Sequence, residues 1–561
     1  MFAAGFVVSL AQRGMADEPA KATRHRMSFP GQTAGREMEV ATATAWVSWL
    51  RNRNYDIGGF LRTDSTLDVI LRPGDSLQKL LDVGFVVLET EASVPLSGAE
   101  RLLDPPPGYA DPAAIDTFMN AVTASHPGIS RKFVIGQSNE GRNILAMEIS
   151  DNPGIAEDEP SILLNGLHHS REVVTPHVVM DAITYLTSEY AAGNPEVAQW
   201  VQNYKIFCVP MVNPDGSHRV HNVDDFHRKN MRAVCTGGGS PNPGVDLNRN
   251  YPYHWGSGAA NCDRGTGSSG TACNDTYRGT GPASEPETLA MMGLAAAERF
   301  VIAVSYHSYG QFIDYPYACN DGNPDNRMPE HEMIDELMHG AASGISTSGG
   351  PLYDVYSPIA IGPVNGDDTS WYYANNGTYA IIIEVGTSFQ PSFATGQTQV
   401  AHNRGGWRYL LERLSGPRID VRVADHLTGL PLVARVELLD FTFDTGELPR
   451  NSDATFGRSR WLVTGNDTYA LRVSKTGYQT RTLAVSVGTS PVNTLVLLIP
   501  EGTKLGDVEP DGDLDMMDYV PYHACLGVEP IPAACRIFDF DADERITLTD
   551  HQMVTELLAG P

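Results

Sequence analysis

Two side chains that can bind a metal ion follow one predicted strand. The apolar run SILLNGL is followed by HHSREVVTP, in which His169 and Glu172 are three residues apart. A turn at the end of a strand lets an imidazole and a carboxylate at this spacing converge on one point, and zinc accepts both ligand types. The same spacing also arises by chance in long chains, so the pair by itself fits a structural role as well.

Two further strand ends carry groups suited to the same chemistry. The strand FVIAVSYHSYGQ brings His307 to its end, and TYAIIIEVG places Glu384 behind an apolar run. A carboxylate in such a position is costly unless it has a partner or a chemical role. Between the first pair and His307 lie the polar segments NPDG, FHRKNMR and GVDLNRNYP. The sequence therefore indicates one site assembled from several strand ends.

These segments, with TYRGTGPASEPET and HSYGQ-x-x-x-YPY, occur in an order and at intervals that resemble the zinc carboxypeptidase family, from about residue 109 to 414. The resemblance implies that His169, Glu172 and His307 bind one zinc ion, with water in the fourth position. Carboxypeptidase A is the standard example of this His₂Glu set.

The resemblance also implies roles for residues around the metal. Asp246 matches the acid that holds the first histidine ligand and fixes its tautomer. Arg228 matches the arginine that stabilises the developing oxyanion beside the scissile carbonyl. Asn248 and Arg249 match the pair that binds the terminal carboxylate of the substrate. Glu384 matches the general base that takes a proton from the zinc water.

The neighbours of these residues are expected to have lesser roles. His168 lies outside the motif and is expected to be a neighbour of the metal site. Lys229 and Arg232 are expected to be solvated. Gly362 stands where the family usually has a tyrosine, which predicts weaker substrate binding or a wider mouth. Tyr353 or Tyr356 could replace that tyrosine if the loop is shifted.

The segment GDDTSW occupies the region where the family sets its side-chain preference, and it resembles carboxypeptidase T. Asp367, Asp368 and Thr369 are therefore expected at the specificity pocket, and Ala318 adds no charge to its other wall. A carboxylate facing the pocket would favour a C-terminal lysine or arginine, whereas outward-facing aspartates would leave an apolar preference. We expect a broad specificity.

Composition narrows the possible partners. The 561 residues are 42% hydrophobic and 19% charged, enough for several cores. A formal charge of -28 argues against a nucleic acid or an anionic membrane as partner. No apolar run is long enough to cross a bilayer. The start, FAAGFVVSLA, resembles a secretory signal within residues 1–20, although no basic residues precede it.

The elements predict four units after that start. Residues 25–100 form a small α/β unit that resembles a pro-domain and ends at the proline-rich LDPPPGYADP. Residues 105–415 alternate strands and helices, which predicts an α/β domain with a mixed sheet. Residues 418–500 alternate apolar and polar, which predicts an antiparallel β-sandwich resembling transthyretin. Residues 503–561 form an acidic, helical module.

The acidic module contains two twelve-residue loops, DVEPDGDLDMMD and DFDADERITLTD. Oxygen-bearing side chains at this spacing suit Ca²⁺, and the two loops resemble a dockerin repeat. Gly512 stands at the sharp turn of the first loop, and Glu544 replaces it in the second, which predicts strain or weaker binding there. Solvated acidic turns are the alternative. The expected calcium ligands are Asp507, Glu509, Asp511, Asp513, Asp515, Asp518, Asp539, Asp541, Asp543 and Asp550.

The cysteines favour an oxidising compartment, because none of the seven forms a CxxC pair. Cys208 lies in an apolar run, where a buried free thiol is expected. Resemblance to the family implies a disulfide among the cysteines near DLNRN, with Cys235–Cys273 the first expectation. Cys525 and Cys535 could close the linker between the acidic loops. We expect a secreted, periplasmic or cell-surface protein.

The principal hypothesis is a secreted zinc carboxypeptidase that removes residues from peptides with a free C-terminal carboxylate. One alternative is a carboxypeptidase for bacterial cell-wall peptides. The other is a binding module whose catalytic site is inactive, although the complete set of ligands and Glu384 argue against it. The dockerin resemblance implies a cohesin-like protein partner.

Overall fold

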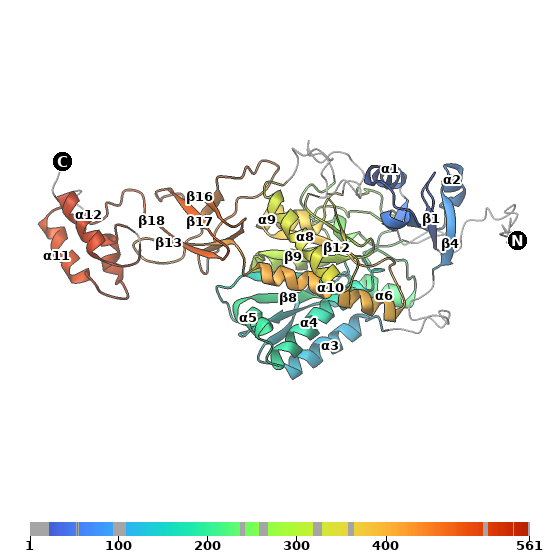
Figure 1. Ribbon diagram of the computed structural model, residues 1–561, viewed down its shortest axis with the longest axis horizontal. Helices are drawn as coiled ribbons and strands as arrows, with labels where there is room; N and C mark the ends of the chain where they lie inside the picture. Colours follow the sequence, from blue (N-terminus) through green and yellow to red (C-terminus); the bar gives the residue numbers. More distant parts are fainter. Residues whose placement is uncertain are drawn as a thin grey trace, which may run out of the picture.

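The computed structural model describes most of the chain, and it is elongated (Figure 1). The residues described are 22–51, 53, 55–93, 108–235, 242–256, 267–317, 328–356, 364–508, 514–541 and 543–558. Four parts follow one another along the molecule: an N-terminal unit (22–93), a central unit (108–415), a sandwich (418–500) and a C-terminal tail (503–558). The expected signal at 1–20, together with Ala318 and Gly362, lies outside the described residues.

The N-terminal unit is a four-stranded antiparallel sheet covered by two helices. The strand order is β2-β3-β1-β4. The helices pack Val47, Leu50 and Leu80 against Met27 and Val69 of the sheet. The elements are β1 (Thr23–Ser28), α1 (Val40–Arg51), β2 (Asp56–Leu61), η1 (Arg62–Asp64), β3 (Thr66–Leu71), α2 (Leu77–Asp82) and β4 (Val86–Ala92).

The central unit contains an eight-stranded mixed sheet of order β11-β10-β12-β9-β7-β8-β6-β5. Strands β12, β9, β7 and β8 run parallel, whereas β10, β6 and β5 each meet a neighbour antiparallel. The mixed α/β class predicted from the sequence is confirmed. The strands are β5 (Ser130–Gln137), β6 (Asn143–Ile149), β7 (Ser161–Gly166), β8 (Lys205–Val209), β9 (Ile302–His307), β10 (Phe312–Asp314), β11 (Asp354–Tyr356) and β12 (Tyr379–Glu384).

Helices cover both faces of this sheet. Alternate residues of its buried strands accordingly belong to two different cores. Ile162 and Leu164 join the core under α4, α8 and α10, whereas Leu163 joins the core with α7 and α9. The helices are α3 (Pro112–Ser125), α4 (Thr175–Ala191), α5 (Pro195–Asn203), α6 (Pro214–Asn222), η2 (Leu247–Arg249), α7 (Pro286–Glu298), α8 (His331–Thr347), α9 (Asp368–Asn376) and α10 (Phe393–Arg413).

Two three-stranded sheets, β15-β13-β18 and β14-β16-β17, form the sandwich around an apolar core. Most pairs are antiparallel, as predicted, but β13 and β18 are parallel, with β18 on the side of β13 opposite β15. The strands are β13 (Arg418–Asp425), β14 (Arg435–Leu438), β15 (Arg458–Leu462), β16 (Asp467–Ser474), β17 (Arg481–Val487) and β18 (Val492–Leu498).

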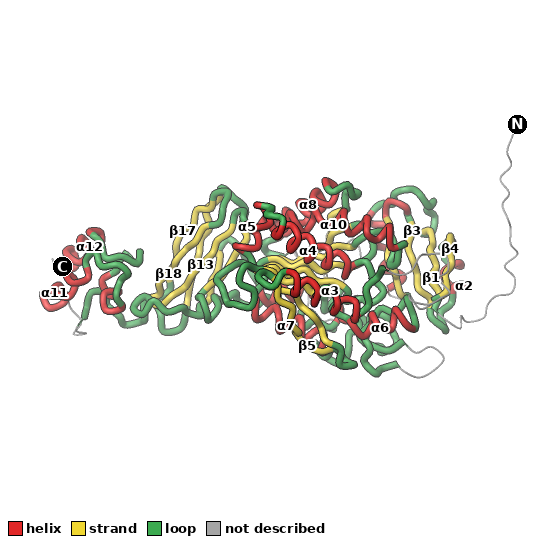
Figure 2. Tube along the Cα trace, turned by 90° about the horizontal axis from the view of Figure 1, so that it is seen from below, coloured by secondary structure: helices red, strands yellow, loops and turns green. Residues whose placement is uncertain are grey.

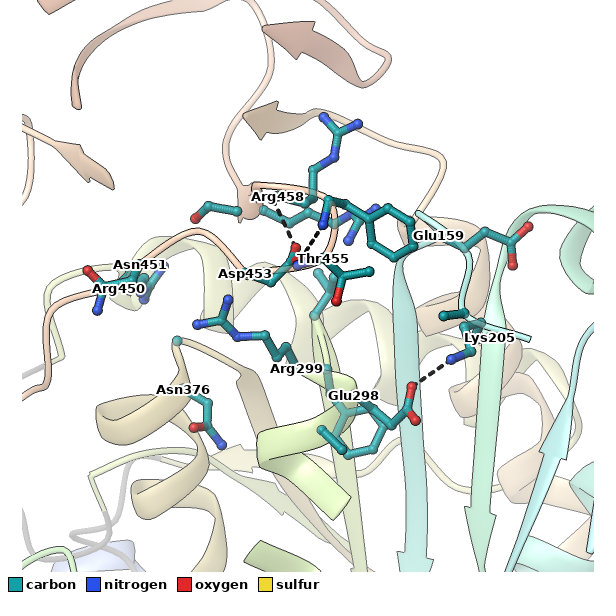
Figure 3. A pocket seen from close by; sticks show the side chains of 18 of the residues that line it. Glu159, Lys205, Glu298, Arg299, Asn376, Arg450, Asn451, Asp453, Thr455 and Arg458 are labelled. Atoms are coloured by element: carbon teal, nitrogen blue, oxygen red, sulfur yellow. Dashed lines mark hydrogen bonds and ion pairs between the residues drawn. The ribbon is translucent and has the colours of Figure 1, made fainter. Parts of the chain in front are cut away.

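Polar contacts join the sandwich to the central unit. The buried guanidinium of Arg450 pairs with Glu330, and Arg458 pairs with Asp158. A cavity of about 220 Å³ lies at this junction (Figure 3). None of the residues predicted for the zinc site lines it, so it is separate from the metal chemistry.

The tail has its own small core, in which Tyr522, Phe538 and Val554 pack together. Its elements are α11 (Met516–Cys525), η5 (Ala533–Phe538) and α12 (Leu548–Leu558). In two perpendicular views the tail lies at the opposite end of the molecule from the N-terminal sheet (Figures 1 and 2).

Disulfides join Cys235 to Cys273 and Cys525 to Cys535, as expected, and Cys208 is a free, buried thiol. Cys262 and Cys319 lie outside the described residues. Over the part of the chain that the structure describes, every helix is too short or too polar to cross a bilayer.

Candidate active site

The two histidines and the glutamate meet where neighbouring parallel strands end. His169 follows β7 and His307 is the last residue of β9, and these strands pair in register through Gly166 and Tyr306. Carboxyl ends of parallel strands share one edge of a sheet, the usual place for a site in such folds. Glu172 reaches the same point from the turn after His169.

The donor atoms of this group are close enough to hold one ion. Glu172 Oε1 lies 2.7 Å from His169 Nδ1, and Oε2 lies 3.1 Å from His307 Nδ1. The two Nδ1 atoms are 3.1 Å apart, so two imidazole nitrogens and a carboxylate surround a common centre. This buried His₂Glu set fits zinc and leaves one coordination position for another ligand.

The surroundings keep both imidazoles in the neutral form that binds a metal. Burial, followed by the charge of Arg228, lowers the pKa of His169 to about 4. Burial, followed by the neighbouring His168, lowers the pKa of His307 to about 3. His168 itself points elsewhere, with Nε2 3.0 Å from the hydroxyl of Tyr251.

Asp246 connects the first histidine to an arginine. Its Oδ1 lies 3.2 Å from His169 Nε2, and its Oδ2 accepts a hydrogen bond from Arg228 Nε at 2.9 Å. Although burial opposes ionisation, Arg228 and Arg249 hold the pKa of Asp246 well below its usual range. An ionised Asp246 therefore fixes both the ring of His169 and the guanidinium of Arg228.

Glu384 ends β12 directly opposite His307 in the parallel pair with β9. Burial and the neighbouring carboxylate of Glu172 raise its pKa well above the usual range. A carboxyl group with a raised pKa beside a metal site can accept and return a proton near neutral pH.

A cavity of about 90 Å³ joins these groups to the N-terminal unit. The central unit contributes the residues predicted for the site, and α1 and β2 close the opposite side. The principal lining residues are His169, Glu172, Arg228, Asn248, Arg249, His307 and Glu384 from the central unit, with Val47, Arg51, Ile57, Gly58, Gly59 and Phe60 from the N-terminal unit.

The sequence model of the zinc carboxypeptidase family matches residues 115–403, slightly more than half of the chain. This range includes the three candidate zinc ligands and Glu384. The chain belongs to the zinc carboxypeptidase family. The matched range spans the mixed sheet from β5 to β12 and the first half of α10.

Curated relatives agree over part of their length. Metallocarboxypeptidase A of Trichophyton rubrum is 34% identical over 246 residues, which are 42% of this chain and 53% of that protein. Zinc carboxypeptidase A 1 of Anopheles gambiae is 28% identical over 265 residues, 46% of this chain and 55% of that protein. The chain thus spans about half the length of the curated relatives it matches.

Solved structures share the fold at low identity. The carboxypeptidase A from Helicoverpa armigera superposes with a TM-score of 0.54 at 20% identity, covering 70% of this chain and 99% of that one. Thrombin-activatable fibrinolysis inhibitor has the same TM-score at 17% identity and covers 70% and 98% of the two chains.

The residues that the family pattern assigns to the terminal carboxylate line the cavity beside the zinc ligands. Asn248 Oδ1 accepts the backbone N–H of Asp368, and its Nδ2 lies 3.3 Å from His307 Nε2. Arg249 donates from Nε to the carbonyl of Gly267 at 2.6 Å, which fixes its guanidinium.

Only one of the three residues expected to set the side-chain specificity lines the cavity. Asp367 lines the cavity, but its Oδ1 caps α9 by accepting from Ser370 N and from the hydroxyl of Thr369. Thr369 and Asp368 are buried behind it and do not line the cavity. Tyr353 is also absent from the lining, because its hydroxyl is bound to Gly386 N instead.

Two cations expected in solvent have partners within the protein. The expectation was wrong for Lys229, whereas the side chain of Arg232 is paired but still 31% exposed. Lys229 is fully buried, with Nζ donating to the carbonyls of Ala272 and Asn274. Arg232 pairs with Glu285 at 2.7 Å. Acceptors more than forty residues away in the chain provide these contacts, and nothing in the local segment FHRKNMR indicates them.

Three residues were not singled out from the sequence: one joins the central unit to the N-terminal unit, and two line the cleft. Arg171, inside HSRE, is fully buried and binds Asp56 of the N-terminal unit at 2.5 and 2.7 Å. Asp314 and Arg51 line the cavity. The only local signal for Asp314 was its place as the last variable position of HSYGQ-x-x-x-YPY. Its contact with the cleft depends on pairing between β10 and β12.

Proposed function

We propose that the protein is a zinc-dependent carboxypeptidase that hydrolyses the last peptide bond of peptides with a free C-terminal carboxylate. The observation that carries this proposal is the convergence of two neutral imidazoles and Glu172, with Glu384 in register beside His307. A bound zinc ion would act as a Lewis acid and lower the pKa of a water molecule.

The protein's own groups supply the other parts of the proposed reaction. Glu384 takes a proton from the attacking water molecule and passes it to the leaving amine. The guanidinium of Arg228, oriented by Asp246, stabilises negative charge on the carbonyl oxygen. Asn248 and Arg249 bind the terminal carboxylate, which restricts cleavage to the end of a chain.

The decisive experiment replaces Glu384 with Gln. In the chain cut between β4 and α3, turnover should fall by about 10²–10⁴-fold, because the base is lost, while zinc content stays at one ion per chain. The exposed Glu412→Gln variant, with the same change of charge, is the control. Full turnover by the Glu384→Gln variant, or equal cleavage of amidated and free peptides by the unaltered protein, would refute the proposal.

The N-terminal unit is proposed to shield the cleft until it is cut away. Its residues Arg51 and Phe60 line the cavity, which leaves only about 90 Å³ of free space. The buried pair between Asp56 and Arg171 supports the same arrangement, because it neutralises a charge of the central unit with one from the N-terminal unit.

The tail is proposed to be a dockerin-like module that binds Ca²⁺ and a cohesin-like protein partner. In support, both loops close in the same way: Asp518 accepts from Val508 N and Asp515 N, and Asp550 accepts from Phe540 N and Thr547 N. Carboxylates of Asp539, Asp541 and Asp543 can meet at one ion. Glu509, Asp511 and Asp513 of the first loop lie outside the described residues.

The sandwich is proposed to be transthyretin-like and structural. We also propose that the protein functions outside the cytoplasm. Two disulfides support this location, because such bonds persist in oxidising compartments.

A further inference from the structure

Asp314 stands on the strand that flanks the general base. Strand β10 runs antiparallel to β12, with Phe312 opposite Glu384 and Asp314 opposite Ile382. Alternate residues of a strand share one face, and all four of these residues line the cavity. Asp314 therefore faces the cleft about 7 Å along the sheet from the position of Glu384, the rise of two residues.

The carboxylate of Asp314 is buried and only partly satisfied. Its Oδ1 accepts the N–H of Tyr315 at 2.9 Å, whereas Oδ2 has no hydrogen-bond partner. Burial, with Asp367 as a neighbouring anion, raises the pKa of Asp314 to about 8. Without a cation beside it this group is therefore mostly protonated near neutral pH, and an incoming cation would favour its ionised form. A buried oxygen without a partner is costly, so the site favours an incoming donor.

The other carboxylate at this end of the cavity is already in use. Asp367 accepts from Ser370 N at 2.8 Å and from the hydroxyl of Thr369 at 2.9 Å. The adjoining wall is apolar, formed by Val364 and Ile382. An apolar wall that ends at one incompletely bonded carboxylate fits a long side chain with a cationic tip.

A side chain of this kind, supplied by the protein itself, already enters the cavity. Arg51, at the end of α1, lines the same space as Asp314. Burial and then the cations Arg249 and Arg228 lower the pKa of Arg51, whereas Asp314 and Glu384 act to raise it. The guanidinium thus lies within the field of both carboxylates.

Resting on the carboxypeptidase activity proposed above, we propose that Asp314 makes the pocket selective for a C-terminal arginine or lysine, and that Arg51 takes the place of that side chain in the uncut protein. The terminal carboxylate would bind Asn248 and Arg249, and the cationic tip would reach Asp314. This replaces the broad specificity expected from the sequence with a preference for basic ends.

The test uses the zinc-loaded full chain, intact and cut once between β4 and α3, with peptides that differ only in a final Arg, Lys, Leu or Phe. The cut chain should cleave the Arg and Lys peptides with a kcat/KM at least tenfold above that for Leu. Asp314→Asn should lower kcat/KM for the basic peptides by about 100-fold, because one partner of a buried charge pair is lost, and change that for Leu less than threefold. The exposed Asp335→Asn variant is the control for the charge change.

A binding measurement serves as a second readout if turnover is low or the Asp314 variant folds poorly. In the zinc-loaded full chain, Arg51→Ala should raise the affinity for free L-arginine at least tenfold, measured by calorimetry, and leave L-norleucine nearly unchanged.

The outcomes separate the two proposals. Better cleavage of Leu than of Arg peptides, or an equal loss on all peptides in Asp314→Asn, overturns the selectivity and leaves the carboxypeptidase activity intact. Equal affinities for arginine and norleucine in Arg51→Ala also overturn it. No cleavage of any peptide by the zinc-loaded cut chain overturns the proposed function and, with it, this inference.

Discussion

The N-terminal unit and the C-terminal tail are both small appended units at opposite ends of the molecule, but their charges are neutralised differently. Asp56 pairs with Arg171 across the boundary, and Arg72 pairs with Asp275 of the central unit at 2.8 Å. In the tail, Arg536 pairs with Glu544 of the same unit. The N-terminal unit also has internal pairs, such as Arg24 with Asp68, but its release would break the pairs that cross the boundary. The pair in the tail would stay intact if the tail moved as a unit.

The largest expected effect comes from breaking the boundary pair. Asp56→Ala should destabilise docking of the N-terminal unit by about 3–5 kcal/mol, because the charge of Arg171 is left buried without its partner. Hydrogen exchange should increase in residues 23–92 and remain low in α11, and peptide hydrolysis by the uncut chain should increase.

Asp64→Ala, which removes an exposed carboxylate of the same unit, is the matched control. The double variant Asp56→Ala with Arg171→Ala should lose less stability than the sum of the single variants. Additive losses would show that the two residues are not coupled, and unchanged exchange would contradict the comparison.

The second prediction concerns the independence of the tail. Asp539→Ala should abolish calcium binding by the second loop and remove about 3 kcal/mol of calcium-dependent stability from the tail at a calcium concentration 100 times the Kd. Exchange should increase in α12, while kcat/KM of the cut chain stays constant. A parallel loss of hydrolysis with a folded central unit would show that the two ends are coupled.

The sequence predicts the long buried strands of the central unit better than it predicts the contacts made by short strands and across unit boundaries. Strands β7, β9 and β12 are apolar runs whose ends carry His169, His307 and Glu384, so strand pattern and motif point to the same site. The short strands β10 and β11 give little periodic signal, and the place of Asp314 depends on their register with β12. The partnership of Asp56 and Arg171 joins residues 115 positions apart, which no local pattern encodes.

A third prediction tests the acidic cluster through pH. Burial raises the pKa of Asp539 to about 6, despite backbone N–H groups of Asp543 and Glu544 that oppose the shift. In the calcium-free tail this group contributes stability at low pH that is lost as the pH rises through about 6. Calcium needs the ionised form, so its affinity should fall by up to tenfold per unit as the pH drops below about 6.

Calorimetry of calcium binding at pH 5, 6 and 7.5, in two buffers with different ionisation enthalpies, would measure both the affinity and the released proton. Asp539→Asn should remove the proton release. An affinity that does not change between pH 7.5 and 5 would contradict a carboxylate site at Asp539.

The smallest effect is expected at the turn of the second loop. Glu544 has φ 61°, in the left-handed region that costs a residue with a Cβ about 1–2 kcal/mol. Both Glu544→Gly and Glu544→Ala lose the contact with Arg536, and only the Ala variant keeps the strain. The Gly variant should therefore be more stable than the Ala variant by about 1 kcal/mol. Hydrogen exchange in α12, measured as a function of temperature, would give the difference in stability between the two variants. If Gly and Ala are equally stable there, the left-handed turn is not the feature that separates the two loops.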